Sequence, residues 1–162
     1  MKSVDVYKFG GVAVGSAEAL RIAAGHVRGR VENPSHIVVV VSAMSGITDL
    51  LHGAARAALE GQPFASAAEE LESRHVALAR EVLKKPQRMI DEIRASAAEL
   101  RAMCQSIAIL RELTRRAEDA VVARGERILA RIFAELTGAE FIDATELVIL
   151  SKRLGSLWPD FV

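Results

Sequence analysis

The chain has 162 residues, which is enough for one ordinary domain with a buried core. Hydrophobic residues make up 51% and charged residues 26%, a composition typical of globular proteins that excludes intrinsic disorder. The 21 Lys and Arg balance the 21 Asp and Glu, so no charge excess points to nucleic acid or an anionic membrane. The single cysteine, Cys104, cannot form an internal disulfide, which fits a reducing, cytoplasmic location. We also expect no signal peptide and no membrane-spanning segment.

The first motif is a strand that ends in a lysine and two glycines. Residues 4–9 alternate apolar and polar side chains, which predicts a β-strand, and Lys8 lies near its carboxyl end, before Gly10 and Gly11. Ser16 then opens a helix. Because glycine lets backbone N–H groups approach an oxyanion and a helix start favours negative charge, the turn predicts an anion site. The spacing matches neither a P-loop nor a dinucleotide fingerprint, so a plain glycine turn with an exposed lysine stays open.

A second strand and the loop after it form the next motif. Residues 37–41 read Ile-Val-Val-Val-Val, without alternation, which predicts a parallel strand buried on both faces. The loop Ser42–Thr48, rich in hydroxyls and glycine, follows at once and leads into a helix. Because ligands collect at the carboxyl ends of parallel strands, Lys8 and this loop should face one crevice. The hydroxyls could equally cap the helix or stabilise the turn, and these roles are compatible with ligand binding.

The middle of the chain is predicted to be helical. Apolar residues recur at steps of three and four along residues 64–82 and 90–107, and Lys84-Lys85-Pro86 interrupts the pattern. This predicts an antiparallel helical hairpin over about residues 64–111. His75 lies in the apolar seam and is expected to be a core histidine, because no second ligand at metal spacing supports a metal role.

A third long helix carries the best acidic candidate. Residues 114–136 place their apolar side chains on one helical face. Gly125 inside this helix costs roughly 1 kcal/mol relative to alanine, so it indicates close approach by another backbone or a ligand. Glu126 follows and could point back toward the sheet; the alternative is a surface pair with Arg127 or Arg131.

The last part of the chain gives weaker signals. Residues 140–144 predict a third short strand with Asp143 at its carboxyl end, and Thr145 is a candidate cap for a further helical turn. Residues 151–162 show no clear periodicity, and we predict no structure for them.

Three of these motifs together resemble a known family. Lys8-Phe9-Gly10-Gly11, the Val41–Thr48 segment and Arg124-Gly125-Glu126 occur in this order, and together they resemble aspartokinase, of the amino acid kinase family. The resemblance covers residues 4 to about 150. It implies a three-layer α/β/α fold with a mainly parallel sheet, carbamate kinase-like, with the helical hairpin as an insertion. The whole chain, residues 1–162, would then be the amino-terminal lobe of a kinase domain.

The resemblance also implies a reaction. Aspartokinases transfer the γ-phosphoryl group of Mg-ATP to the β-carboxylate of L-aspartate, giving 4-phospho-L-aspartate, the first step of lysine, threonine and methionine biosynthesis. Such a transfer needs positioning and neutralisation of oxygen charge. The implied site consists of a catalytic Lys8, phosphate-binding Gly10 and Gly11, and substrate-binding Ser42, Thr48 and Glu126. No metal ligand is assigned to the chain, and Mg²⁺ would arrive on the nucleotide.

Departures from the family pattern support a second hypothesis. Val12 and Ala13 stand where the family usually has a Thr-Ser pair, and the nucleotide-binding half and the regulatory modules have no counterpart in these residues. The chain could therefore be a non-catalytic truncated relative or subunit that serves as an interaction module. The joint presence of Lys8, Thr48 and Glu126 favours the kinase. A kinase for glutamate or a nucleotide is a third and weaker reading, because of the Ser42–Thr48 loop.

The partners follow from the first hypothesis. They are L-aspartate and ATP, with no nucleic acid and no membrane. Half of a parallel sheet would expose an edge and an apolar face, so we also expect a homo-oligomer or a complementing kinase half.

Overall fold

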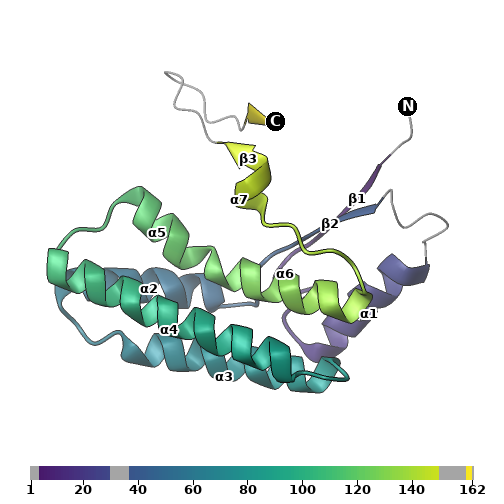
Figure 1. The fold of residues 1–162 in the computed structure, drawn as a ribbon, viewed down its shortest axis with the longest axis horizontal. Helices are drawn as coiled ribbons and strands as arrows, with labels where there is room; N and C mark the ends of the chain where they lie inside the picture. Colours follow the sequence, from purple (N-terminus) through teal and green to yellow (C-terminus); the bar gives the residue numbers. More distant parts are fainter. Residues whose placement is uncertain (1–3, 30–36, 150–159, 162) are drawn as a thin grey trace.

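Helices make up most of the molecule, and a small parallel sheet lies at one end of them (Figure 1). A computed structural model describes residues 4–29, 37–149 and 160–161. Its elements are β1 (Asp5–Phe9), α1 (Ala17–Gly29), β2 (Ile37–Val41), α2 (Ile47–Glu60), α3 (Ala65–Val82), α4 (Gln87–Leu110), α5 (Arg115–Val122), α6 (Arg124–Thr137), α7 (Ala144–Leu147), β3 (Val148–Ile149) and β4 (Asp160–Phe161). The α/β class and the parallel pairing expected from the sequence are confirmed.

The strands β1 and β2 form a parallel pair joined by helix α1. The register runs from Asp5 opposite Ile37 to Phe9 opposite Val41. Ser16 caps α1, because its Oγ accepts a hydrogen bond from the backbone N–H of Ala19 at 3.1 Å. This βαβ unit brings the carboxyl ends of both strands to the same edge of the sheet.

Helix α6 covers one face of this sheet, and the other face is bare. Phe9 packs toward α6, where its ring lies 5.9 Å from the ring of Phe133. On the opposite face, Val6 is 65% exposed, and Val38 and Val40 are each 47% exposed. The expectation that residues 37–41 are buried on both faces is therefore wrong for the part of the chain that the structure describes. The helices that pack on the sheet lie on one side of it only, so alternate valines are left in water.

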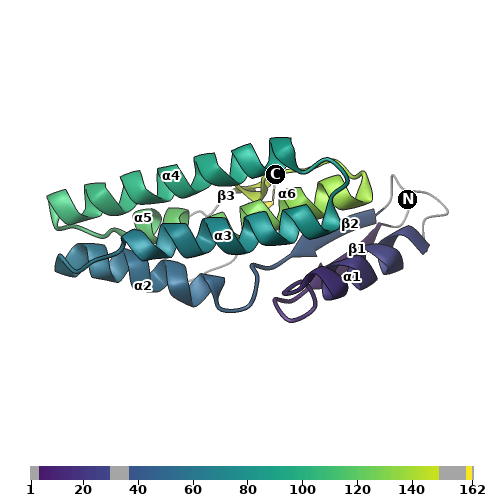
Figure 2. The same cartoon turned by 90° about the horizontal axis from the view of Figure 1, so that it is seen from below.

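The helical hairpin dominates the core. Helices α3 and α4 lie side by side along their length, and α2 and α6 pack against them (Figure 2). The largest fully buried side chains of the bundle include Leu51, Leu71, Ile93, Leu100, Leu129 and Ile132. Burying one such side chain contributes about 1.5–3 kcal/mol, so this bundle supplies most of the hydrophobic stabilisation.

Two polar or reactive side chains lie inside this core. His75 lies in the core, as expected, but is fully and not partly buried, and its Nδ1 lies 2.7 Å from the Leu71 carbonyl oxygen. Cys104 is also buried, and burial raises the pKa of its thiol although the nearby Arg124 charge opposes this shift. A thiol with a raised pKa in apolar surroundings is a poor nucleophile, so Cys104 has a structural role.

The predicted helix over residues 114–136 is two helices. Helix α5 ends at Val122 and α6 begins at Arg124, with Ala123 between them. Arg124, the first residue of α6, binds the Glu99 carboxylate of α4 through its Nη1 at 2.7 Å. The break lets α5 pack on α2 while α6 runs across to the sheet.

The third strand predicted over residues 140–144 is wrong. These residues have no strand structure, and α7 begins at Ala144. Asp143 explains the difference, because its Oδ1 accepts hydrogen bonds from the N–H of Thr145 at 3.0 Å and the Thr145 hydroxyl at 2.8 Å. A side chain that binds the backbone two residues ahead favours a turn over a strand. The cap is therefore Asp143 and not Thr145.

The end of the chain lies largely outside the described residues. A short antiparallel ladder pairs β3 with β4, through Val148 opposite Phe161 and Ile149 opposite Asp160. Most of residues 151–162, for which the sequence predicted no structure, fall outside the described part. Within that part, no helix is long and apolar enough to cross a membrane.

Candidate functional site

The first two motifs touch at the carboxyl edge of the sheet. The backbone N–H of Ser42 donates to the carbonyl oxygen of Phe9 at 3.1 Å. A Cβ on Gly11 would lie 3.0 Å from the carbonyl oxygen of Ala43, closer than nearly all real contacts of this kind. The glycine turn and the Ser42–Thr48 loop are therefore packed backbone against backbone, and a side chain at residue 11 would push the two apart by a few tenths of an ångström.

The third motif packs on the same loop from the other side. A Cβ on Gly125 would lie 2.7 Å from Cγ2 of Ile47 and 2.9 Å from Cβ of Ala43. The glycine does mark a close approach, but the predicted partner, another backbone or a ligand, is wrong: Gly125 faces the side chains of Ala43 in the loop and Ile47 at the start of α2. The first and third motifs, more than 100 residues apart in sequence, therefore both pack on the Ser42–Thr48 loop.

Lys8 lies on the bare face of the sheet. It pairs with Val40 of β2 and its side chain is exposed, one residue before the last pair of the ladder. By the alternation of a strand it shares a face with Val6. The ammonium group is therefore presented at the carboxyl end of the sheet, on the side that the helices of the described chain leave open.

The Ser42–Thr48 loop enters α2 without a side-chain cap. Gly46 is the N-cap of α2, in the left-handed region at φ 79°, and no side chain accepts a hydrogen bond from the first turn. Helix capping at α2 is therefore wrong as an explanation for the hydroxyls of Ser45 and Thr48. Thr48 lies in the first turn, where unpaired backbone N–H groups and the helix dipole favour an anion.

Glu126 holds a buried carboxylate oxygen without a hydrogen-bond partner. Its Oε2 is buried in the first turn of α6, next to Gly125. The surface pairs considered for it are wrong: Arg127 binds the Asp143 carboxylate at 2.9 Å, and Arg131 binds Glu92 at 3.0 Å. A buried carboxylate oxygen without a partner carries a desolvation penalty that a bound cation would relieve.

Arg74 is a site neighbour that the sequence did not reveal. It extends from the middle of α3, and its Nη2 donates to the carbonyl oxygen of Ser45 at 2.7 Å. The only sequence signal was Glu70 one turn earlier, a spacing common on helix surfaces. Nothing in the sequence indicates which loop the hairpin lies beside.

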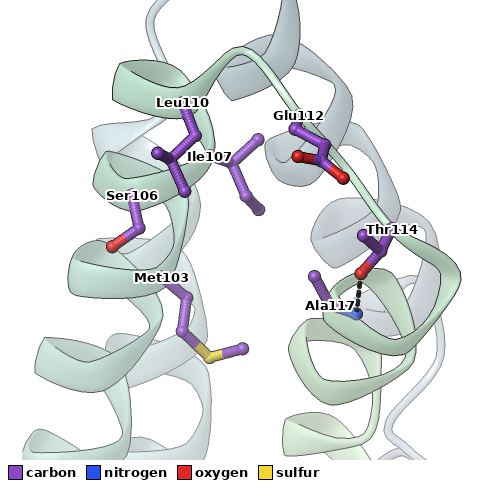
Figure 3. Close-up of a pocket in the computed structure, with 7 residues that line it drawn as sticks. All are labelled: Met103, Ser106, Ile107, Leu110, Glu112, Thr114 and Ala117. Atoms are coloured by element: carbon purple, nitrogen blue, oxygen red, sulfur yellow. Dashed lines mark hydrogen bonds between the residues drawn. The ribbon is translucent and has the colours of Figure 1, made fainter.

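The open cavities lie away from this site. A cavity of about 300 Å³ opens between the end of α4 and the start of α5, where Thr114 caps α5 through the N–H of Ala117 (Figure 3). A second cavity of about 320 Å³ lies between α4, α6 and Phe141. Neither is lined by a residue of the three motifs, and among the described residues no group of His, Cys, Asp or Glu could hold a metal ion.

Comparison with known proteins identifies the family of the chain. A family model described as "Amino acid kinase family" matches residues 4–157. The chain belongs to the amino acid kinase family. It is 31% identical over 171 residues to bifunctional aspartokinase/homoserine dehydrogenase 1 of Arabidopsis thaliana. It is 27% identical over 167 residues to bifunctional aspartokinase/homoserine dehydrogenase 2 of Zea mays. These alignments cover 97% and 98% of the chain but only 18% of each relative.

Solved structures show the same fold. E. coli aspartokinase III in complex with aspartate and ADP matches with a TM-score of 0.82 and 24% identity, over 98% of this chain and 35% of that one. Clostridium acetobutylicum aspartate kinase matches with a TM-score of 0.67 and 22% identity, over 90% of this chain and 31% of that one. The amino acid kinase fold expected from the sequence is thus confirmed, and the chain spans about a third of each matched structure. The cytoplasmic location stays a prediction, because the plant relatives are named as chloroplastic.

Proposed function

We propose that this chain is the aspartate-binding and phosphate-contacting lobe of an aspartate kinase. The observation that carries the proposal is the buried, unpartnered carboxylate oxygen of Glu126, which follows the Gly125 that packs on the Ser42–Thr48 loop. An α-ammonium group would give this oxygen the charged donor that it lacks. The hydroxyls of Ser42 and Thr48, on the loop against which Gly125 packs, would bind the carboxylates of the same small amino acid.

The positively charged groups proposed for the site suit a phosphate. Lys8 supplies a mobile cation, and the turn at Gly10 and Gly11 supplies backbone close to the loop. The first turn of α2 adds the positive end of a helix dipole. A site with a carboxylate on one side and cationic groups on the other fits a zwitterionic acceptor and an anionic donor at once.

The proposed reaction is phosphoryl transfer to a carboxylate. A β-carboxylate oxygen of L-aspartate forms a bond to the γ-phosphorus of ATP while the bond to the β,γ-bridging oxygen breaks, leaving ADP and 4-phospho-L-aspartate. Lys8 would neutralise charge on the transferring group, and Glu126 would hold the acceptor in line. Mg²⁺ carried on the nucleotide would supply further neutralisation, and no residue of this chain is assigned to hold it.

The nucleotide half of the site is proposed to come from another polypeptide segment. The chain spans 35% of the E. coli enzyme's length, and that enzyme was solved with ADP. The bare valines of β1 and β2 flank Lys8, so a complementing kinase half seated there would cover the apolar face and deliver ATP to the lysine. The same bare face is what favours the second candidate, a non-catalytic interaction module.

Aspartate binding to the folded chain, measured by calorimetry, tests this function. We expect Glu126→Gln to weaken binding roughly 10- to 100-fold, the range for losing one charge-assisted hydrogen bond in a buried site. Glu135→Gln is the control on the same helix: its Oε2 is also buried without a hydrogen bond, with the Arg88 guanidinium 3.9 Å away. It should leave binding unchanged.

The outcomes separate the candidates. A folded chain that binds no aspartate at millimolar concentration contradicts the substrate lobe and favours the interaction module. Equal loss in both variants would mean that Glu126 acts only through helix stability. ATP-dependent formation of aspartyl hydroxamate then shows whether the chain turns over alone or only after the complementing half is added.

A further inference from the structure

A side chain of the helical hairpin reaches the proposed substrate loop. Arg74 lies in the middle of α3, and its Nη2 donates to the carbonyl oxygen of Ser45 at 2.7 Å. Its Nη1 lies 3.8 Å from the position that a Cβ on Gly46 would take. Glu70, one turn earlier on α3, forms an ion pair with the guanidinium, with 3.6 Å between Nη1 of Arg74 and Oε1 of Glu70. The hairpin therefore contacts the loop through one directed, charged donor.

The bond falls at the point where the loop turns into α2. Gly46 has φ 79° and lies inside the turn closed by the hydrogen bond from the Ile47 N–H to the Met44 carbonyl oxygen, at 3.0 Å. The Leu50 N–H then donates to the Gly46 carbonyl oxygen, also at 3.0 Å, as α2 begins. Glycine has no side chain that could hold this turn, and no side chain caps the helix. Because the Ser45 carbonyl and the Gly46 N–H belong to one planar peptide, a donor on the oxygen also fixes the direction of the N–H.

We infer that Arg74 is a positioning residue that holds the Ser42–Thr48 loop in its ligand-binding orientation. The inference rests on the proposed function, since the loop is the proposed aspartate and phosphate contact. Arg74 acts through the Ser45 carbonyl and does not itself touch the ligand. Thr48 lies two residues beyond Gly46 in the same helical turn, so a rotation of the Ser45–Gly46 peptide would carry the Thr48 hydroxyl with it.

The molecule offers a contact of the same kind away from the site. Arg21 of α1 donates through Nη2 to the carbonyl oxygen of Glu81 at 2.6 Å and also contacts the Glu81 carboxylate at 3.4 Å. It joins two helices as Arg74 joins a helix and a loop, but it touches none of the three motifs. A contribution of Arg74 to stability alone would therefore be matched by Arg21, whereas a positioning effect would not.

The test compares Arg74→Ala, Arg74→Lys and Arg21→Ala in the whole chain. Amide hydrogen exchange reports the loop directly and needs no ligand, and calorimetry with L-aspartate reports its function. We expect Arg74→Ala to raise exchange at Ile47 and Leu50 roughly tenfold or more, the effect of losing a hydrogen bond to a charged group. Arg74→Lys should restore part of the protection, because lysine offers a donor without the planar fork. Arg21→Ala should leave both amides unchanged.

The outcomes distinguish this inference from the proposed function. If the wild-type chain binds aspartate, Arg74→Ala should weaken binding about tenfold while the melting temperature matches that of Arg21→Ala. If the wild-type chain binds no aspartate, the proposed function fails, and the role of Arg74 at the binding loop fails with it even if the loop amides lose protection. Unchanged exchange at Ile47 in Arg74→Ala overturns the inference, and so does an increase spread evenly over all helices.

Discussion

The helical bundle buries its apolar surface more completely than the parallel sheet does. In the bundle, the seams of α3 and α4 are closed by each other and by α2 and α6, and residues such as Leu71 and Leu129 are fully buried. In the sheet, Phe9 faces the helices, but Val38 on the other face is half exposed. The two regions come from one chain with one composition, so the difference lies in which partners each region has.

This difference shows which region covers its apolar surface with neighbouring segments of the same chain. A helical hairpin brings its own partner, because the two helices are adjacent in sequence and joined by a short turn. A parallel strand pair needs layers on both faces, and the described residues supply one. The proposed binding residues come from both regions. Glu126 lies in the first turn of α6, in the bundle, and Lys8 lies on the bare face of the sheet. Substitutions in the bundle are therefore expected to change stability more than substitutions on the bare face of the sheet.

The largest expected effect is in the bundle core. Leu71→Ala removes a fully buried side chain of α3 and should lower the free energy of unfolding by about 2–5 kcal/mol. Val38→Thr, on the bare face of β2, keeps the β-branched shape and should change it by less than about 0.5 kcal/mol. Urea denaturation at neutral pH measures both. Similar losses in the two variants would show that the bare face is covered in solution.

A smaller effect is expected where the two regions touch. Gly125→Ala places a Cβ 2.7 Å from Ile47 and should destabilise the chain by about 1–3 kcal/mol through overpacking. It should also weaken aspartate binding, because α6 must move away from the loop. Gly53→Ala in α2 is the matched control: its Cβ would meet nothing within 4 Å, so helix propensity should make it neutral or stabilising by up to about 1 kcal/mol. Thermal melts and calorimetry compare the pair, and an undisturbed Gly125→Ala contradicts the close approach.

The smallest expected effect is a pH dependence of the bundle. Burial lowers the pKa of His75 to about 4 from 6.5, outweighing the hydrogen bond to Leu71 that raises it. The depressed pKa means that the unfolded chain gains a proton first, so stability is full above pH 6.5 and falls as the pH drops toward 4. Between pH 7 and pH 5.5 the loss should be about 1 kcal/mol. His75→Leu should remove this part of the slope in denaturation experiments, and an unchanged slope would mean that His75 is accessible to protons when folded.

Much of the local structure could be predicted from the sequence. The periods of three and four along α3 and α4 reflect one buried helical face, and that pattern needs no knowledge of the partner. The Lys8-Phe9-Gly10-Gly11 turn, the Ser42–Thr48 loop and Glu126 were found because phosphate and amino acid chemistry call for those residue types after strands and at helix starts. Their roles as ligands stay predictions that binding measurements must test.

Two of the errors, the strand over residues 140–144 and the unbroken helix over residues 114–136, arise at positions where a polar side chain makes a specific contact. The third strand over residues 140–144 was wrong because the Asp143 side chain captured the Thr145 backbone, a competition that strand propensity does not register. The break at Ala123 was missed because both helices share an apolar face, and the contact of Arg124 with Glu99 of α4 lies beside it. In each case the hydrophobic pattern does not register the polar contact.

The sequence alone therefore determined the first two strands, the helices with a clear apolar face and the residue types proposed for the site. Periodicity and glycine position are local properties, and they are written in a few neighbouring residues. Only the tertiary structure decided that Gly125 rests on Ile47, that Arg74 holds the Ser45 carbonyl, and that the valines of one sheet face stay bare. These depend on packing between segments far apart in the chain, whose mutual placement is fixed by the sum of many contacts and not by any one stretch of sequence.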